Sequence, residues 1–465
     1  MMKQKKELVI LLLLLAGSIA MYAGSAVIKK NAYPREQAAA GTSSLQSLLE
    51  GVSASEITSL SWNNGSEEIR AVRDKGTWSL ESHPDLPLLV SRPEEMADAL
   101  VSLKTERTIT GQDAKDYGLD PAAQSLAFET ADGSSHTLSI GNKASVEDAW
   151  YVMLDDTGKI GLASTELPSM LTADIYKLVR NESMKTILSP DRMEIQRADG
   201  SSLVLVKPED PEKYAYTDYY TWFVEDNGTL RALDRGKAED LVNTVLQVKW
   251  QSCVNYHINY NKDVINEYGF DHPALRAEVE GGGEAVCLLS GAAAGEGLCY
   301  AQPEGSDMAY TIKSEDADKL ERASYDSLRP EDICHMNWSR VSEISITADG
   351  RTRNIGVKAS EPGAEEKYIY TENGAVLDYQ AVTDIKAMID KMVPAKQLED
   401  ASYVPSGEPV LKIVFRQDNE AFGEMELEFY RYSDMYDLVR FNGETRQLIS
   451  VHAADAVRRL TERLN

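Results

Sequence analysis

A chain of 465 residues is longer than a single hydrophobic core usually grows, so its length predicts two to four domains. Acidic residues outnumber basic ones by 75 to 48, which gives a formal net charge of −27. This excess excludes broad contact with nucleic acid, whose phosphates require Lys and Arg, and it disfavours lying flat on an anionic lipid surface.

The first predicted element is a membrane-spanning helix. From Leu8 to Ile28 the chain carries no charged side chain. A helix of this length spans roughly 31 Å, which matches the hydrocarbon core of a bilayer. The alternative is a cleaved signal peptide, because small residues at 23–26 follow a basic start and a leucine run. A lipoprotein is less consistent with the sequence, since its first cysteine is Cys253.

The orientation of this helix is less clearly encoded than its insertion. Basic residues flank it on both sides, namely Lys3, Lys5 and Lys6 before it and Lys29, Lys30 and Arg35 after it. The positive-inside count is therefore close to a tie. The very short N-terminal tail favours a single-pass protein of the cell membrane that contacts lipid through residues 8–28. Its C-terminal body is then extracytoplasmic.

Residues 31–55 are predicted to form a spacer. Pro34, an alanine run and Gly41-Thr42-Ser43-Ser44 lack the alternation of a strand. The folded body begins after the spacer, with a first strand at Ile57 to Trp62.

Beyond this strand, tight-turn signals separate short apolar runs along the whole body. They are Asn64-Gly65, Asp74-Lys75-Gly76, Asp132-Gly133, Asp199-Gly200, Asn227-Gly228, Asp349-Gly350, Asn373-Gly374 and Asn442-Gly443. Asn and Asp tolerate left-handed backbone and Gly prefers it, as hairpin turns require. The pattern predicts antiparallel β meanders.

The body also repeats itself. Tyr117-Gly118-Leu119-Asp120-Pro121 recurs about 150 residues later as Tyr268-Gly269-Phe270-Asp271-His272-Pro273. Three further pairs share this spacing: Gly141 and Gly291, Tyr151 and Tyr300, and Ser164 and Ser314. A shared offset among four anchors indicates two copies of one folding unit.

A third, more divergent copy follows about 135 residues later, with Tyr403 and Ser450 at the positions of Tyr268 and Ser314. Its loop reads Tyr403-Val404-Pro405-Ser406-Gly407, so the Tyr-Gly-Leu-Asp motif is lost.

Each copy has one plan: hairpins, a helix, the loop, a second hairpin and a closing helix capped by Ser164, Ser314 or Ser450. The predicted apolar helix faces are Met96, Leu100 and Leu103, then Leu241, Val245 and Val248, then Ile385, Met388, Ile389 and Met392. The fold class is therefore α+β, with an N-terminal transmembrane helix followed by three tandem repeats of antiparallel β meanders with covering helices. The predicted domains are the anchor (1–30), the spacer (31–55), repeat 1 (56–180), repeat 2 (181–330) and a degenerate repeat 3 (331–465).

These features resemble the family catalogued as domain of unknown function 4340. The features in common are a strand ending in Trp78, the loop from Tyr117 to Pro121, Ile140-Gly141, and Tyr151-Val152. The resemblance is good from about Ile57 to Val179, partial from about Met184 to Arg329 and faint beyond. It implies anchoring by one N-terminal helix, and a gene placed beside those of ABC transporters similar to the gliding-motility type.

Candidate chemistry in the sequence has simpler structural explanations. Asp120 and Asp271 could serve as acids or ligands, but an Asp between Gly and Pro also forms a turn. The histidines lack metal-ligand spacing, and the chain has neither a phosphate-binding glycine loop nor a Gly-x-Ser-x-Gly elbow. We therefore expect no metal, no cofactor and no enzymatic activity, although carboxylate catalysis needs no local motif.

The strongest binding signal is a row of aromatic residues: Tyr214, Tyr216, Tyr219, Tyr220 and Trp222. An exposed row of this kind can stack on sugars or seat a partner protein. Strand propensity explains the same residues without a ligand, and Trp78 and Trp222 are predicted to fill the core.

The four cysteines allow two interpretations. The chain has an even number of them, which is compatible with disulfides in an oxidising compartment: Cys253, Cys287, Cys299 and Cys334. The pair predicted to form a bridge is Cys287 and Cys299, on either side of a glycine-rich turn. The alternative is four buried thiols.

These observations favour a membrane-anchored, extracytoplasmic accessory or scaffold protein. Through its resemblance, the expected partner is an ABC transporter permease or another envelope protein. The alternative is an envelope glycan- or peptide-binding module that uses the aromatic row.

Overall fold

The computed structural model describes residues 46–464 except 106, 146–147, 156, 397 and 399–402. The predicted membrane helix at 8–28 lies outside the described residues, as does most of the predicted spacer. Among the residues that are described, no helix is both long and apolar enough to cross a bilayer. The chain divides after Asn181 into two compact units, and each is described by itself.

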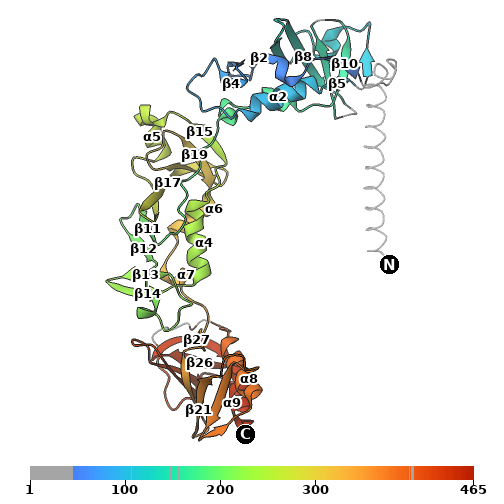
Figure 1. Ribbon diagram of the computed structural model, residues 1–465. Helices are drawn as coiled ribbons and strands as arrows, with labels where there is room; N and C mark the ends of the chain where they lie inside the picture. The colour runs from blue at the N-terminus through green and yellow to red at the C-terminus, as the bar shows by residue number, and fades with distance from the viewer. Residues whose placement is uncertain are drawn as a thin grey trace, which may run out of the picture. The chain divides into compact units, whose positions relative to one another are not determined.

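The first unit is built on one antiparallel sheet with the strand order β4-β3-β2-β7-β8-β9-β10-β6 (Figure 1). A separate two-stranded ladder joins β1 and β5. The elements are β1 (Gln46–Ser47), η1 (Ala54–Glu56), β2 (Ile57–Asn63), β3 (Glu68–Asp74), β4 (Thr77–Leu80), α2 (Ser91–Val101), β5 (Lys104–Thr105), β6 (Arg107–Ile109), η2 (Ala114–Tyr117), β7 (Gln124–Thr130), β8 (Ser135–Lys143), β9 (Trp150–Leu154), β10 (Ile160–Ala163), α3 (Leu167–Leu171) and η3 (Ile175–Leu178).

The second unit contains two sheets. Its first sheet has the order β14-β13-β12-β11-β16-β17-β18-β19-β15. The elements are β11 (Arg192–Arg197), β12 (Ser202–Val206), η4 (Pro211–Lys213), β13 (Phe223–Asp226), β14 (Thr229–Ala232), α4 (Arg235–Leu246), β15 (Ser252–Asn255), η5 (Ile258–Tyr260), α5 (Lys262–Tyr268), β16 (Leu275–Gly281), β17 (Glu284–Gly295), β18 (Leu298–Pro303), β19 (Ala309–Lys313), α6 (Ser314–Glu321) and α7 (Tyr325–Leu328).

The last sheet has the order β23-β22-β21-β20-β24-β25-β26-β27. Its elements are β20 (Val341–Ala348), β21 (Arg351–Ala359), β22 (Tyr368–Glu372), β23 (Ala375–Val376), α8 (Tyr379–Asp390), β24 (Leu411–Gln417), β25 (Glu424–Arg431), β26 (Tyr436–Phe441), β27 (Glu444–Ser450) and α9 (Val451–Glu462).

The three large sheets share one topology. In each, the first strand (β2, β11 or β20) lies inside the sheet, and the hairpins that follow it run outward to one edge. A later strand (β7, β16 or β24) pairs with the other side of that first strand and starts a second meander toward the opposite edge. In the first two sheets this edge carries an additional strand, β6 or β15, from the segment between the covering helix and the loop. The α+β prediction is confirmed.

The predicted turns have the backbone that a tight hairpin needs. Asn227, Asp349, Asn373 and Asn442 have φ angles of 49°, 52°, 50° and 48°, and each precedes a glycine that also has positive φ. A short Asx side chain tolerates this left-handed conformation and Gly adopts it freely, so these pairs reverse the chain at little cost.

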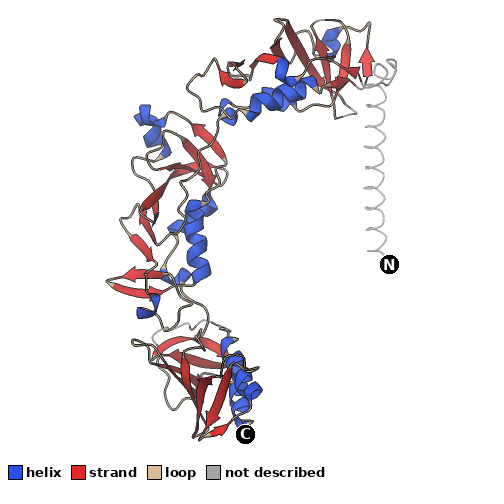
Figure 2. Ribbon diagram, in the orientation of Figure 1, coloured by secondary structure: helices blue, strands red, loops and turns tan. Residues whose placement is uncertain are grey.

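Helices cover one face of each sheet in the second unit (Figure 2). The predicted apolar face of α4 is buried through Leu241 and Val245, and that of α8 through Ile385 and Ile389. The side chains of Asp234 and Asp378 cap these helices by accepting hydrogen bonds from Lys237 N and Ala381 N.

The predicted serine caps are found in only one copy. Ser450 caps α9 by accepting a hydrogen bond from His452 N at 3.4 Å. Ser314 is instead the first residue of α6, after Lys313, and α3 begins three residues after Ser164. The Ser164 hydroxyl instead donates to the carbonyl of Asp148, 16 residues earlier in the chain, at 3.1 Å.

Candidate functional site

The Tyr-Gly-Leu-Asp loop docks onto a glycine of the second strand after it, β8 or β17. A Cβ atom built on Gly141 would lie 2.2 Å from the carbonyl oxygen of Tyr117. In the next copy, a Cβ on Gly291 would lie 1.9 Å from the carbonyl oxygen of Tyr268. Only glycine permits this approach of two backbones, which explains why the loop and the glycine recur together.

The loop tyrosine also packs on the tyrosine of the return strand. Tyr117 meets Tyr151 edge to face at 4.7 Å, and Tyr268 stacks on Tyr300 at 4.1 Å. Gly118 and Gly269 end the preceding helical turns with φ of 71° and 78°. Three of the repeat anchors found in the sequence therefore form one structural contact, which holds the loop against the sheet.

The loop carboxylates do not converge on a site. Asp120 and Asp271 are both exposed. Among the described residues, no three His, Cys, Asp or Glu side chains lie together in a way that could hold a metal ion.

The tyrosine-rich segment between β12 and β13 does not form the exposed row that its sequence suggests. Tyr216 is 8% exposed, Tyr220 3% and Trp222 1%. Trp222 fills the core of the β11–β19 sheet, as does Trp78 in the first unit, where it is 2% exposed. The expectation of a five-residue surface must be corrected, because Tyr216, Tyr220 and Trp222 lie in an irregular segment outside the strands and pack into two hydrophobic cores.

The two buried tyrosines instead join the sheets of the second unit. Tyr216 and Tyr220 belong to the core of the β20–β27 sheet, and the Tyr216 ring lies 4.8 Å from that of Phe441. We call this contact the tyrosine joint. Its exposed remainder is Tyr214 and Tyr219, at 44% and 41%.

Three hydrogen bonds link the tyrosine joint to the last sheet and to the segment before it. The Tyr216 hydroxyl accepts from His335 N at 2.9 Å, and the Tyr216 carbonyl accepts from Gln417 Nε2 at 2.9 Å. The Tyr220 hydroxyl donates to Asp332 at 2.6 Å. Burial raises the pKa of both phenols above the usual range.

A buried lysine, which sequence reasoning missed, lies in the last sheet. Lys386 on α8 is 8% exposed and its Nζ donates to the Tyr370 hydroxyl at 3.0 Å. The same Nζ lies 4.6 Å from the Tyr368 ring and 4.9 Å from the Trp338 ring. Burial lowers the pKa of Lys386. Its signal in the sequence was a lysine on the apolar face of a predicted helix, where the aromatic rings now stabilise it.

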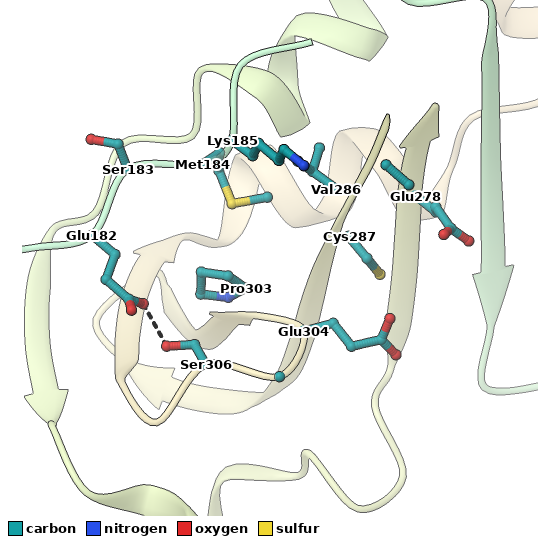
Figure 3. Close-up of a pocket in the computed structure, with 12 residues that line it drawn as sticks. Glu182, Ser183, Met184, Lys185, Glu278, Val286, Cys287, Pro303, Glu304 and Ser306 are labelled. Carbon is teal, nitrogen blue, oxygen red and sulfur yellow. Dashed lines mark hydrogen bonds between the residues drawn. The ribbon is translucent and has the colours of Figure 1, made fainter. Parts of the chain in front are cut away.

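A pocket of the second unit opens between residues 182–185 and the β16–β18 strands, with a volume of about 630 Å³. Figure 3 shows Met184 and Pro303 in its centre, between Glu182 on one side and Glu278 and Glu304 on the other. The Ser306 hydroxyl donates to Glu182 at 2.5 Å. The pocket thus combines an apolar floor with a carboxylate rim.

One arginine neutralises two of these carboxylates. Arg276 contacts Glu304 through Nε at 3.0 Å and Nη2 at 2.8 Å, and Glu278 through Nη1 at 2.8 Å. These hydrogen bonds hold the pKa of Glu304 below its usual range and raise that of Arg276. Lys185 forms an ion pair with Glu284 beside the pocket.

All four cysteines are buried and none forms a disulfide, so the predicted bridge between Cys287 and Cys299 is wrong. Cys299 packs in the core of its sheet, whereas Cys287 lines the pocket. Successive strand residues point to opposite faces, and the neighbours of Cys287 at 286 and 288 are in that core. Burial raises the pKa of the Cys287 thiol to about 12, which makes it a poor nucleophile.

Comparison with known proteins identifies the family. The family model described as "Domain of unknown function (DUF4340)" matches residues 78–255 and again residues 222–400. The chain belongs to the DUF4340 family. Each DUF4340 match begins at an equivalent buried tryptophan, Trp78 or Trp222, so the repetition that the sequence suggests is also present in the matches. No curated protein and no solved structure matches the chain.

Proposed function

We propose that this DUF4340 protein is a membrane-anchored, extracytoplasmic accessory or scaffold subunit of an envelope complex, such as one built on an ABC-type transporter. The tyrosine joint is the observation that carries the proposal. It joins the two sheets of the second unit through a buried core and through hydrogen bonds. Two sheets held together in this way present a fixed surface, which suits a protein that positions partners.

The anchor is part of this proposal. The uncharged segment at residues 8–28 has the length of a membrane helix, and the short N-terminal tail favours an outside body. A reporter fused after Asn465 tests the orientation. We expect activity of a reporter that requires export, and a reporter active only in the cytosol would contradict the proposal.

Co-purification tests the scaffold role. The full chain is tagged in its native cells, extracted in mild detergent and isolated together with its partners. We expect a permease or another envelope protein to be recovered in a fixed ratio. As a control, residues 8–28 are replaced by an unrelated membrane helix, which keeps the location and changes only the anchor. Recovery of the chain alone, under conditions that preserve other envelope complexes, would refute the role.

The alternative is an envelope glycan- or peptide-binding module. It is favoured only by the exposure of Tyr214 and Tyr219, since the rest of the aromatic row is buried. The variant Tyr214→Ala/Tyr219→Ala should then abolish binding to isolated envelope glycan or peptide. Unchanged binding would eliminate this alternative.

A further inference from the structure

The pocket lies at the place in its sheet where the tyrosine joint lies in the last sheet. The strand registers establish this correspondence. Leu288 and Leu427 each pair with the middle one of three apolar core residues of the preceding strand, β16 or β24. On their other side, Leu288 pairs with Pro303 and Leu427 pairs with Phe441. Pro303, which lines the pocket, is therefore the counterpart of Phe441, on which the Tyr216 ring packs at 4.8 Å.

A second wall of the pocket also has a counterpart in the tyrosine joint. Residues 182–185 lead into β11, and residues 332–335 lead into β20. The spacing of 150 between them is the spacing of the helical turns that precede them, η3 and α7. At this spacing Glu182, which lines the pocket, corresponds to Asp332, the carboxylate to which the Tyr220 hydroxyl donates. The pocket thus repeats both the ring contact and the acceptor of the tyrosine joint.

The two places differ in how deeply their residues are buried. In the tyrosine joint, Ile333 and Cys334 are 1% and 3% exposed, because they share one core with the two buried tyrosines. At the pocket, their counterparts Ser183 and Met184 are exposed and half-buried. The open volume of about 630 Å³ is of the size that binding pockets in proteins have.

The segment that fills the tyrosine joint comes from the copy before it. This segment, which we call the plug, is the connection between β12 and β13, residues 207–222. In the first copy, the corresponding connection between β3 and β4 is the two-residue turn Lys75-Gly76. The first copy therefore has no counterpart of the plug, although the second copy has a counterpart of the socket that receives it.

We infer that the pocket is a second socket of this type, and that it binds a tyrosine-bearing segment of a partner protein. This inference rests on the proposed scaffold function and names the chemistry of its partner. The partner's tyrosine ring packs on Pro303 and its hydroxyl donates to Glu182, as the plug does at Phe441 and Asp332. A carboxylate accepts several hydrogen bonds, so the bond from Ser306 to Glu182 leaves room for this one.

The chemistry of the pocket selects tyrosine among the aromatic residues. Met184 and Pro303 lie in its centre (Figure 3), where a thioether and an apolar ring suit an aromatic face. The rim carries the carboxylates of Glu182, Glu278 and Glu304. These groups accept a hydrogen bond from a phenol, whereas phenylalanine has none to donate and an acidic side chain is repelled.

A peptide of the plug itself serves as the probe. The peptide has the sequence of residues 213–222, with rhodamine on its N-terminus and an amide at its C-terminus. It is titrated with the full chain in nanodiscs of zwitterionic lipid, and anisotropy is recorded. The covalent plug excludes this peptide from the tyrosine joint, because its effective concentration there is high. We expect saturable binding, about tenfold or more tighter than that of a peptide with serine in place of the four tyrosines.

A pair of tryptophan variants places the binding in the pocket. Ala285 is an exposed residue of β17 that lines the pocket, so the indole of Ala285→Trp occupies the space of the partner's ring. This variant should weaken peptide binding about tenfold or more. Ala375→Trp is the matched control at an exposed position of β23, and it should bind like the native chain. Both variants should keep the native unfolding transition, because both positions are exposed.

A double-mutant cycle tests the hydrogen bond to Glu182. Phenylalanine at the Tyr220 position of the peptide should weaken binding to the native chain about threefold or more, because the hydroxyl is lost. The same change in the peptide should have no effect on binding to Glu182→Ala. If Glu182 only shapes the pocket, both chains lose the same factor, and the assignment of Glu182 as the acceptor is refuted.

Two results would overturn the inference as a whole: no saturable binding of the peptide up to millimolar concentration, or equal binding by the native chain and Ala285→Trp. Co-purification distinguishes this failure from that of the scaffold role. A partner recovered equally by the native chain and by Ala285→Trp removes only the socket. If no partner is recovered at all, the scaffold role fails, and the peptide titration still decides whether the pocket binds a tyrosine segment.

Discussion

Replacing Gly291 with alanine should destabilise the second unit strongly. The new Cβ would lie 1.9 Å from the Tyr268 carbonyl oxygen, whereas ordinary van der Waals contact begins near 3.4 Å. The loop backbone must therefore retreat by about 1.5 Å. Because the obstacle is a backbone atom, no side-chain rotation can relieve it.

The expected cost has two parts. Forcing a methyl group into a closed space typically costs about 1–3 kcal/mol. A retreat of the loop also disturbs the stack of Tyr268 on Tyr300, which is worth about 0.5–1.5 kcal/mol. We therefore expect Gly291→Ala to lower the unfolding free energy by about 2–4 kcal/mol.

Calorimetry of the full chain in detergent, with hydrogen exchange to assign each transition, measures this effect. Gly291→Ala should lower the transition of residues 182–465 and leave that of the first unit unchanged. Gly141→Ala should do the reverse, since its Cβ would meet the Tyr117 carbonyl oxygen at 2.2 Å.

A matched glycine provides the control. Gly236 lies in α4, where the nearest atom to a new Cβ is Asp234 Oδ1 at 3.4 Å. Gly236→Ala should stabilise the protein by about 0.5–1 kcal/mol, because alanine favours the helix. A loss smaller than about 0.5 kcal/mol for Gly291→Ala would show that the close backbone approach does not hold the loop.

Three further predictions follow from buried polar groups. Asp437 is fully buried, and although Arg431 Nε lies 2.9 Å from its Oδ1, neither oxygen has a hydrogen bond from a described residue. Burial raises its pKa in the fold, so its contribution to stability is lost as pH rises through that pKa. Asp437→Asn should then raise the free energy of unfolding by about 1–3 kcal/mol at pH 7. Urea unfolding should show that this gain falls toward zero in acid. A gain that does not depend on pH would show that the charge of Asp437 is not its cause. Tyr220→Phe removes the hydrogen bond to Asp332 in the tyrosine joint and should lower the free energy of unfolding by about 1–3 kcal/mol in the same assay. Tyr214→Phe, at a half-exposed ring, should not change it measurably. Equal effects of the two variants would refute the role of the tyrosine joint. Thiol titration with a chromogenic disulfide should detect almost no reaction in the native chain and four thiols after denaturation. Fewer than four reactive thiols in the denatured chain under non-reducing conditions would indicate a disulfide.

The sequence by itself determined the hairpin turns, the apolar helix faces and the repetition of the folding unit. Asx-Gly pairs such as Asn373-Gly374 predicted the hairpins, because few residues adopt left-handed backbone. The recurrence of Tyr117 and Gly141 as Tyr268 and Gly291 predicted a repeated unit and the family, and these residues prove to touch each other. The periodic apolar faces of α4 and α8 also followed from the sequence, since helical spacing alone places them on one side.

Only the tertiary structure decided which of the aromatic residues remain exposed. Tyr216 and Tyr260 look alike in sequence, yet one is buried against Phe441 from another sheet and the other stays 85% exposed. The tertiary structure also decided that Cys287 and Cys299, which are near in sequence, lie on opposite faces of a sheet. It likewise surrounded Lys386 with aromatic rings from β22 and from the segment before β20. Local patterns encode backbone conformation, whereas exposure depends on contacts between residues that are distant in the chain, and single-sequence spacing does not record those contacts.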